Sequence, residues 1–271
     1  MRYFIKIYSI ILISFLTISC KNEISPNIIK IVEPLKDYTR FYTFDTLPGV
    51  ISKKLENKAT INELELLIEN YKNPYVKAIA IDILINKNEE IAFELFEKHI
   101  NSNDSIVFRT ECLRESILLP SYIFNSTIFS HKQSLKEQKE NNKEKFFKIL
   151  FNQENLNVDL VDELYLWLPN SEEYYKIIRE NIVKNKSKKL LRALSSFKNK
   201  NDVELIKSFG QDSFIGIAYF NDDAFLKMFE KYISINKNWH YKFALNQYPK
   251  SKTKMIYLKI ENYNKIKNNG Y

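Results

Sequence analysis

The chain has very little glycine. Only four of its 271 residues are glycine, at positions 49, 210, 216 and 270. Glycine supplies the tight turns of all-β proteins and the close backbone approach of dinucleotide-binding loops, so both types of fold are disfavoured. The sequence also has no Gly-x-Ser-x-Gly nucleophile elbow and no glycine-rich phosphate loop. These absences argue against sheet-based hydrolases and nucleotide-binding enzymes.

Histidine is also scarce. The three histidines, His99, His131 and His240, are far apart, and none belongs to a His-Glu-x-x-His motif. A zinc site of the metalloprotease type therefore has no support. Ser-x-x-Lys, a motif of penicillin-binding enzymes, begins at three serines, but the abundance of Ser and Lys predicts about that number by chance. Those serines are Ser195, Ser234 and Ser251.

Adjacent carboxylates occur four times, at Glu89–Glu90, Asp162–Glu163, Glu172–Glu173 and Asp222–Asp223. Each pair lies near an expected helix start, where negative charge compensates the exposed N–H groups. We therefore interpret them as helix-start residues rather than as glycosidase acids. Taken with the scarcity of histidine, this predicts a protein with no catalytic, metal-binding or cofactor-binding residue.

The chain contains only two cysteines, Cys20 and Cys112. Cys20 ends the segment MRYFIKIYSIILISFLTISC, in which two basic residues precede an apolar run of about a dozen residues. Such a run is ~18 Å long as a helix. It is too short for a membrane-spanning helix, which needs ~20 apolar residues, and is typical of a signal peptide. Hydrophobicity stops at Cys20, because Lys21 follows directly.

This arrangement resembles the lipobox of bacterial lipoproteins. The resemblance implies that residues 1–19 are removed as a signal peptide and that a lipid is attached to the thiol of Cys20. The lipobox usually has Leu three residues before the cysteine; here that position is Thr17, and Leu16 lies one residue earlier. An ordinary secretory signal is the alternative, and it would also export the chain. If Cys20 is lipidated, Cys112 is unpaired, and we expect it to be a small buried residue.

The basic residues are mostly lysine. The chain has 41 basic and 33 acidic residues, and only six of the basic ones are Arg. The predicted signal peptide holds two basic residues and no acidic one, so the mature chain keeps 39 basic residues against 33 acidic ones. Nucleic-acid binders usually cluster their basic residues and use Arg prominently. We therefore predict a solvated surface and no binding of nucleic acid.

Helical spacing of apolar residues dominates from Thr60 onward. Thr60 and Glu63 have the spacing of a capping box, and Asn73–Pro74 is a typical helix start. Earlier, prolines interrupt residues 20–58, which we predict to be a tether with a β-prone segment at 38–45. Expected helices begin at Thr60 and Asn73 and cover 89–100, 104–120, 146–151, 157–167, 171–184, 187–197, 201–209, 222–233 and 252–267, with a polar helix or loop at 130–145.

The segment from Asn73 to Leu84 resembles the second helix of a HEAT repeat, and Asp104 to Leu113 resembles a degenerate second copy. The resemblance implies an all-α fold, a HEAT-like α-solenoid of antiparallel helix pairs that stack to share a core. An irregular all-α domain is the alternative. The predicted organisation is a signal peptide (1–19), a lipidated N-terminus and tether (20–58) and a helical-repeat domain (59–271).

Together these features predict a membrane-anchored envelope lipoprotein that acts as a non-catalytic protein–protein interaction or scaffold module. Its expected partners are the membrane, through the lipid on Cys20, and another envelope protein or peptide. In a Gram-negative cell we expect the outer membrane rather than the inner one. The alternatives are an immunity or inhibitor lipoprotein that neutralises a toxin, and an envelope hydrolase with an unrecognised site. Trp239, beside His240, is expected to pack against the last helices.

Overall fold

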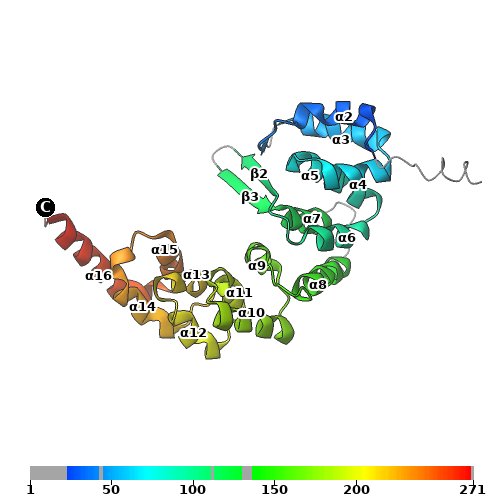
Figure 1. Ribbon diagram of the computed structural model, residues 1–271. Coiled ribbons are helices and arrows are strands. Elements are labelled where there is room, and N and C mark those ends of the chain that lie inside the picture. The colour runs from blue at the N-terminus through cyan, green and yellow to red at the C-terminus, as the bar shows by residue number, and fades with distance from the viewer. Residues whose placement is uncertain (1–22, 43–44, 111–112, 130–135, 270–271) are drawn as a thin grey trace, which may run out of the picture. The chain divides into compact units, whose positions relative to one another are not determined.

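The computed structural model describes residues 23–42, 45–110, 113–129 and 136–269 (Figure 1). The predicted signal peptide, the predicted lipidation site Cys20, and Cys112 and His131 lie outside the described residues. The described chain is mainly helical, as the sequence predicts. It forms two compact units, described separately below: unit 1 comprises residues up to 92 and 103–127, and unit 2 comprises 93–102 and 128–271.

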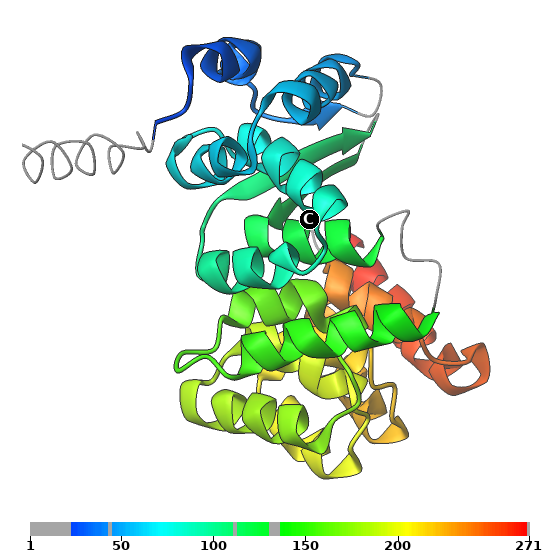
Figure 2. The same cartoon turned by 90° about the vertical axis from the view of Figure 1, so that its right-hand side faces the viewer.

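Unit 1 combines helices with a small sheet (Figures 1 and 2). Its described elements are α2 (Pro26–Val32), a 3-10 turn (Glu33–Leu35), β1 (Phe41–Tyr42), α3 (Leu47–Lys58), α4 (Ile61–Asn70), α5 (Pro74–Lys87), β2 (Ser105–Thr110), β3 (Leu113–Leu118) and α7 (Leu119–Ile128).

Residues 26–42 and 45–58 are folded, contrary to the expectation of a tether. Helices α2 and α3 contact each other, and α3 contacts α5. Their apolar residues Ile28, Val32, Ile51 and Leu55 are buried. The three prolines are compatible with this, because Pro26 and Pro48 lie in first helical turns, where the missing N–H is not needed. Residue 58 is therefore not a domain boundary in the structure.

Helix α5 is the centre of unit 1. Apolar residues on every side of it are buried, from Tyr75 to Ile85, as is typical of a helix surrounded by its own domain. Asn73 caps its start by accepting a hydrogen bond from the Tyr75 N–H at 2.8 Å. The Asn73 amide also donates to the carbonyls of Leu35 and Lys36, at 2.9 and 3.0 Å, which ties α5 to the segment after α2. The predicted capping box of Thr60 and Glu63 is present at the start of α4.

The segment after Asp104 is a β-hairpin, so the helix predicted from 104 to 120 and the second HEAT-like copy within it are wrong. Strand β2 pairs antiparallel with β3, with Ser105 opposite Leu118, and parallel with β1, with Phe41 opposite Phe108. Residues 105–108 contain two adjacent β-branched residues, which favour a strand. Asp104 binds Lys77 at 2.7 Å instead of capping a helix.

Unit 2 is helical throughout its described residues (Figure 2). Its helices are α6 (Ile91–His99, which begins in unit 1), α8 (Lys136–Phe151), α9 (Val158–Leu164), α10 (Glu172–Asn185), α11 (Leu191–Ser196), α12 (Val203–Lys207), α13 (Phe214–Ile217), α14 (Leu226–Lys231), α15 (Trp239–Asn246) and α16 (Lys250–Asn269). Short 3-10 turns precede α11, α12, α13 and α14, at Lys188–Leu190, Lys200–Asp202, Gly210–Ser213 and Asp223–Phe225.

Alternate helices of unit 2 contact one another. Helix α11 packs between α9 and α13, and α13 packs between α11 and α15. A second series consists of α12, α14 and α16. Helix α12 contacts the 3-10 turn before α14, and α14 contacts α16. Aromatic side chains fill the last part of the core: the ring centres of Phe214 and Tyr241 are 4.9 Å apart, and those of Phe229 and Tyr241 are 5.2 Å apart.

Candidate functional site

The described His, Cys, Asp and Glu side chains form no cluster suited to a metal ion. Among residues 23–42, 45–110, 113–129 and 136–269, no group of three or more His, Cys, Asp and Glu side chains is placed to hold a metal ion. His99 ends α6, and His240 lies exposed in the first turn of α15. Desolvation lowers the pKa of His240, and the charge of Arg192 lowers it further. Ser195 is fully buried in α11.

Trp239 is exposed, contrary to the prediction that it packs against the last helices. Its side chain is 66% accessible and stacks on Phe243, with ring centres 5.2 Å apart. It stays outside because the apolar face of α15 is formed by other residues, Tyr241, Ala244 and Leu245. Trp239 therefore adds apolar surface to the outside of unit 2.

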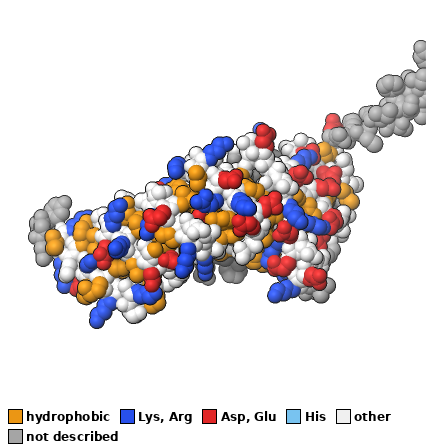
Figure 3. Space-filling model, turned by 90° about the horizontal axis from the view of Figure 1, so that it is seen from below, with side chains coloured by type: hydrophobic (Ala, Val, Ile, Leu, Met, Phe, Trp, Pro, Cys, Tyr) orange, Lys and Arg blue, Asp and Glu red, His pale blue; other side chains and the backbone are white. Residues whose placement is uncertain are grey.

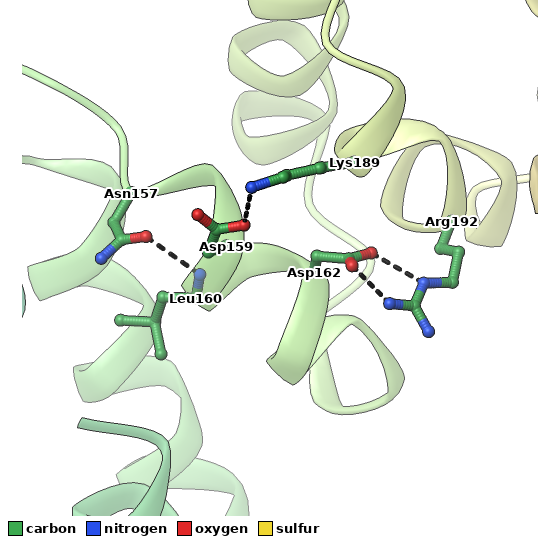
Figure 4. Close-up of polar contacts among 6 residues, drawn as sticks. All are labelled: Asn157, Asp159, Leu160, Asp162, Lys189 and Arg192. Atoms are coloured by element: carbon green, nitrogen blue, oxygen red, sulfur yellow. Dashed lines mark hydrogen bonds and ion pairs between the residues drawn. The ribbon is translucent and has the colours of Figure 1, made fainter. Parts of the chain in front are cut away.

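Two of the adjacent carboxylate pairs lie at helix starts, as predicted, and a third does not. Glu172 and Glu173 lie in the first turn of α10, and Asp222 accepts a hydrogen bond from the Ala224 N–H at 2.9 Å, as expected of helix starts. Asp162 instead lies near the end of α9. Its carboxylate binds the guanidinium of Arg192 in α11 through two contacts, with Nε to Oδ1 at 2.7 Å (Figure 4).

These contacts join neighbouring helices of unit 2. Figure 4 shows Asp159, one turn before Asp162, bound to Lys189, while Asn157 caps the same helix by accepting from the Leu160 N–H at 3.0 Å. The Arg192 guanidinium also lies over the Tyr165 ring, 5.1 Å from its centre. Hydrogen bonding to Asp162 raises the pKa of Arg192. The arrangement is a structural clamp between α9 and α11, and every charge in it is already paired.

A surface on α15, α16 and the turn before α15 is different, because its lysines form no ion pair in the described part of the chain. We define the basic groove as Lys237, Lys242, Lys250, Lys254, Tyr257 and Leu258. It consists of a cavity of about 380 Å³ between α15 and α16 and an adjoining one of about 660 Å³ along α16, with Tyr257 lining both. The Tyr257 hydroxyl donates to Asn246 Oδ1 at 2.9 Å, which holds the ring between the two cavities.

The walls of the basic groove carry four lysines and one acid, Glu261, which is paired with Lys265 at 2.7 Å, and its floor is apolar. Its four lysines are exposed, and within the described part of the chain none of them forms an ion pair. The buried side chains of Tyr241 and Leu245 line the cavity between the helices. Leu258 is 45% accessible, which is high for a leucine. A ligand in this groove would meet several ammonium groups around a hydrophobic surface.

The charge of the groove follows from local composition. Residues 224–271 contain ten lysines, no arginine and only two acidic residues, Glu230 and Glu261. Both acids are paired, Glu230 with Lys259 and Glu261 with Lys265, each at 2.7 Å. The overall net charge does not reveal this site, because it combines the lysine-rich residues 224–271 with a larger segment that contains most of the acidic residues. The useful signal is the near absence of acidic residues after Asp223.

On the face shown in Figure 3, Lys and Arg side chains lie among Asp and Glu side chains and among hydrophobic ones. No helix of the described residues combines the length and the apolar character needed to cross a membrane. Comparison of the chain with models of protein families, with characterised proteins and with solved structures found no significant match.

Proposed function

We propose that this chain is an exported lipoprotein, anchored to an envelope membrane through Cys20, that binds an acidic, amphipathic segment of another envelope protein in the basic groove. The observation that carries the binding proposal is the set of four exposed lysines without ion pairs around an apolar floor. The anchor rests on the N-terminal sequence, in which a short apolar run ends at Cys20.

We further propose that unit 2 is a HEAT-like solenoid of stacked helix pairs. Two features support this: alternate helices contact one another in two series, and ion pairs recur at a regular separation along the chain. Asp159–Lys189 and Asp162–Arg192 join residues 30 apart, and Asp223–Lys252 joins residues 29 apart. A stack of this kind leaves its outer surfaces free for binding.

A protein partner suits the groove better than nucleic acid. Lysine is a flexible point charge, whereas nucleic-acid sites usually need the planar fork of arginine, and no arginine occurs after residue 192. Unpaired lysines attract an acidic partner from a distance. Tyr257 and Leu258 then supply the apolar contact on which most of the affinity of a protein interface depends. We propose a non-catalytic role, which rests on the lack of a recognisable catalytic motif in the sequence.

The anchor is tested by replacing Cys20→Ala in the full chain. We expect the wild-type protein to incorporate a clickable fatty acid and to sediment with membranes, and the variant to lose both properties. A Cys112→Ala variant is the matched control and should behave like the wild type. Unchanged fatty-acid labelling of Cys20→Ala would refute the lipid anchor but would leave the groove proposal untouched.

The groove is tested by photo-crosslinking in cells. A photoreactive amino acid at Leu258 should give a discrete crosslinked protein, while the same group at Lys54, an exposed residue of helix α3, should not give that product. Reversing the charge of the four groove lysines to Glu should remove the product, whereas reversing the exposed lysines 53, 58, 72 and 87 should not. A product that survives reversal of the groove lysines would overturn the proposal. Mass spectrometry of the partner would separate a scaffold from a toxin-neutralising inhibitor.

A further inference from the structure

Unit 1 contains a pocket that the proposed function does not use. Its volume is about 500 Å³, within the range of small-molecule sites. It lies among α3, α5, α7 and the strands β1 and β2, so most of the described elements of unit 1 contribute to its wall. Phe41, Phe108 and Tyr122 form the aromatic part of the wall, Ile79 adds an aliphatic part, and Asp82 supplies a carboxylate.

Asp82 is a half-buried acid that forms no ion pair within the described residues. Its Oδ2 accepts a hydrogen bond from the Tyr122 hydroxyl at 2.6 Å, and its Oδ1 accepts one from Ser126 Oγ at 2.8 Å. Over the described ranges of the chain, no lysine, arginine or histidine forms an ion pair with it. Burial raises the pKa of Asp82, while the two hydroxyl donors oppose that rise. A buried carboxylate is costly unless a positive charge compensates it.

Three aromatic rings line the same pocket as this acid, and one of them, Tyr122, contacts its carboxylate. The Phe108 ring stacks on the Tyr122 ring, with centres 6.1 Å apart and planes at 14°. The Phe41 ring follows, with its centre 5.9 Å from that of Phe108. The faces of aromatic rings attract cations, most strongly where water is excluded. Carboxylate and rings therefore favour the same kind of ligand, a positively charged group attached to an apolar body.

We propose that this pocket binds a small organic ammonium ion, with its charged nitrogen at Asp82 and its apolar body against Phe41, Phe108 and Tyr122. Asp45 adds a second carboxylate to the wall; its Oδ1 accepts from the Leu47 N–H at 3.1 Å, and its Oδ2 accepts from the Tyr38 hydroxyl. Among the described residues that line the pocket, Arg109 is the one basic residue, and it is exposed. The two acids outnumber the single base, so the pocket favours a monovalent cation over an anion.

Two pairs of probes test the charge preference. Phenethylamine and 2-phenylethanol share a ring and a chain length but differ in charge at pH 7, and tryptamine and tryptophol form a larger pair. Calorimetric titration of the full-length protein in detergent should show at least one amine binding tenfold or more tightly than its alcohol. Equal affinities within both pairs would show a merely apolar pocket, and no binding by either amine would also overturn the proposal.

Variants test the site. Asp82→Asn should weaken amine binding at least tenfold and leave alcohol binding within twofold, while Glu56→Gln, an exposed acid on α3, should change neither. If Asp82→Asn fails to fold by circular dichroism, Gly49→Leu replaces it. Gly49 lines the pocket, and a Cβ atom there would meet no atom within 4 Å, so a leucine can start from this position without a clash at Cβ and take up pocket volume. Amine affinity unchanged in either folded variant would refute the assignment.

Discussion

A glycine and a serine in the core of unit 2 make a quantitative test of its packing. Gly216 of α13 faces Ser195 of α11, and both residues are buried. A Cβ atom on Gly216 would lie 2.5 Å from Ser195 Oγ and 3.1 Å from the Leu191 carbonyl oxygen. The first distance is shorter than real contacts allow, and the second involves backbone that cannot rotate away. Gly216→Ala should therefore force α11 and α13 apart.

The expected loss can be worked out from two opposing effects. Overpacking a dense core costs about 1–3 kcal/mol. Replacing glycine by alanine within a helix stabilises the folded state by up to about 1 kcal/mol, because alanine has the higher helix propensity. We therefore expect Gly216→Ala to lower the free energy of unfolding by roughly 1–2 kcal/mol. Ser195→Ala should act in the opposite direction, because the Ser195 hydroxyl has no hydrogen-bond partner among the described residues and its burial costs about 1 kcal/mol or more.

Urea unfolding of the two single variants and the double variant gives the coupling between the sites. In the Ser195→Ala background, Gly216→Ala should cost at least about 0.5 kcal/mol less than in the wild type, because the nearest atom is gone. Gly49→Ala is the control: its Cβ would meet nothing within 4 Å, so it should raise stability by about 0.5–1 kcal/mol. The reasoning fails if Gly216→Ala stabilises the protein as Gly49→Ala does.

Two further predictions concern charged residues. Hydrogen bonds from Ser25 and Thr60 lower the pKa of Glu63 from 4.5 to about 2, so its stabilisation is complete above pH 4.5 and is lost as pH falls toward 2. Glu63 is partly solvated, so we expect about 1 kcal/mol, seen as a smaller change in urea midpoint between pH 7 and pH 3 for Glu63→Gln than for the wild type. Arg192→Ala should cost about 2 kcal/mol, because it leaves the half-buried Asp162 unpaired. Lys189→Ala breaks an exposed pair and should cost less than about 1 kcal/mol; equal losses in thermal unfolding would contradict this distinction.

Signals that act over a few residues are reliable in this sequence. The capping box of Thr60 and Glu63 and the start of α5 at Asn73–Pro74 are both present, because each depends on hydrogen bonds between residues two or three apart. The helices expected at 157–167 and 171–184 are found as α9 with its 3-10 extension and as α10. The Asn73 amide also donates to the carbonyl oxygens of Leu35 and Lys36, which lie 38 and 37 residues earlier, and no short sequence pattern predicts these two contacts.

The β-hairpin shows where local pattern fails. Residues 105–118 contain apolar residues compatible with either a helix or a strand, and the β-branched residues Ile106, Val107 and Ile117 carry only a weak preference. Contacts with distant residues settle the matter. Phe108 pairs with Phe41 of β1, and the Val107 N–H donates to the Tyr75 hydroxyl at 3.1 Å. Because these partners lie 32 and 67 residues away, a window of ten or twenty residues cannot reveal them.

The candidate site was only partly predictable for the same reason. The surplus of lysine is plain in the composition, but the lysines that remain unpaired depend on which acids the fold brings close. Within α16, Lys252 reaches Asp223, whereas Lys250 and Lys254, on the neighbouring face, reach no acid in the described structure. Positions two residues apart on a helix point in different directions, so adjacent lysines have different roles.

The four ion pairs that join residues 29 or 30 apart share an order along the chain: the acid precedes the base. Asp159, Asp162, Asp223 and Glu230 bind Lys189, Arg192, Lys252 and Lys259, respectively. Helix α16 contributes two of the bases and contains one acid, Glu261, which is paired within the helix with Lys265. The ion pairs of α16 use Lys252, Lys259 and Lys265, and the helix contains further lysines that these pairs do not use. The fold does not need the charge of Lys250 and Lys254, and for that reason the charge is available to a partner.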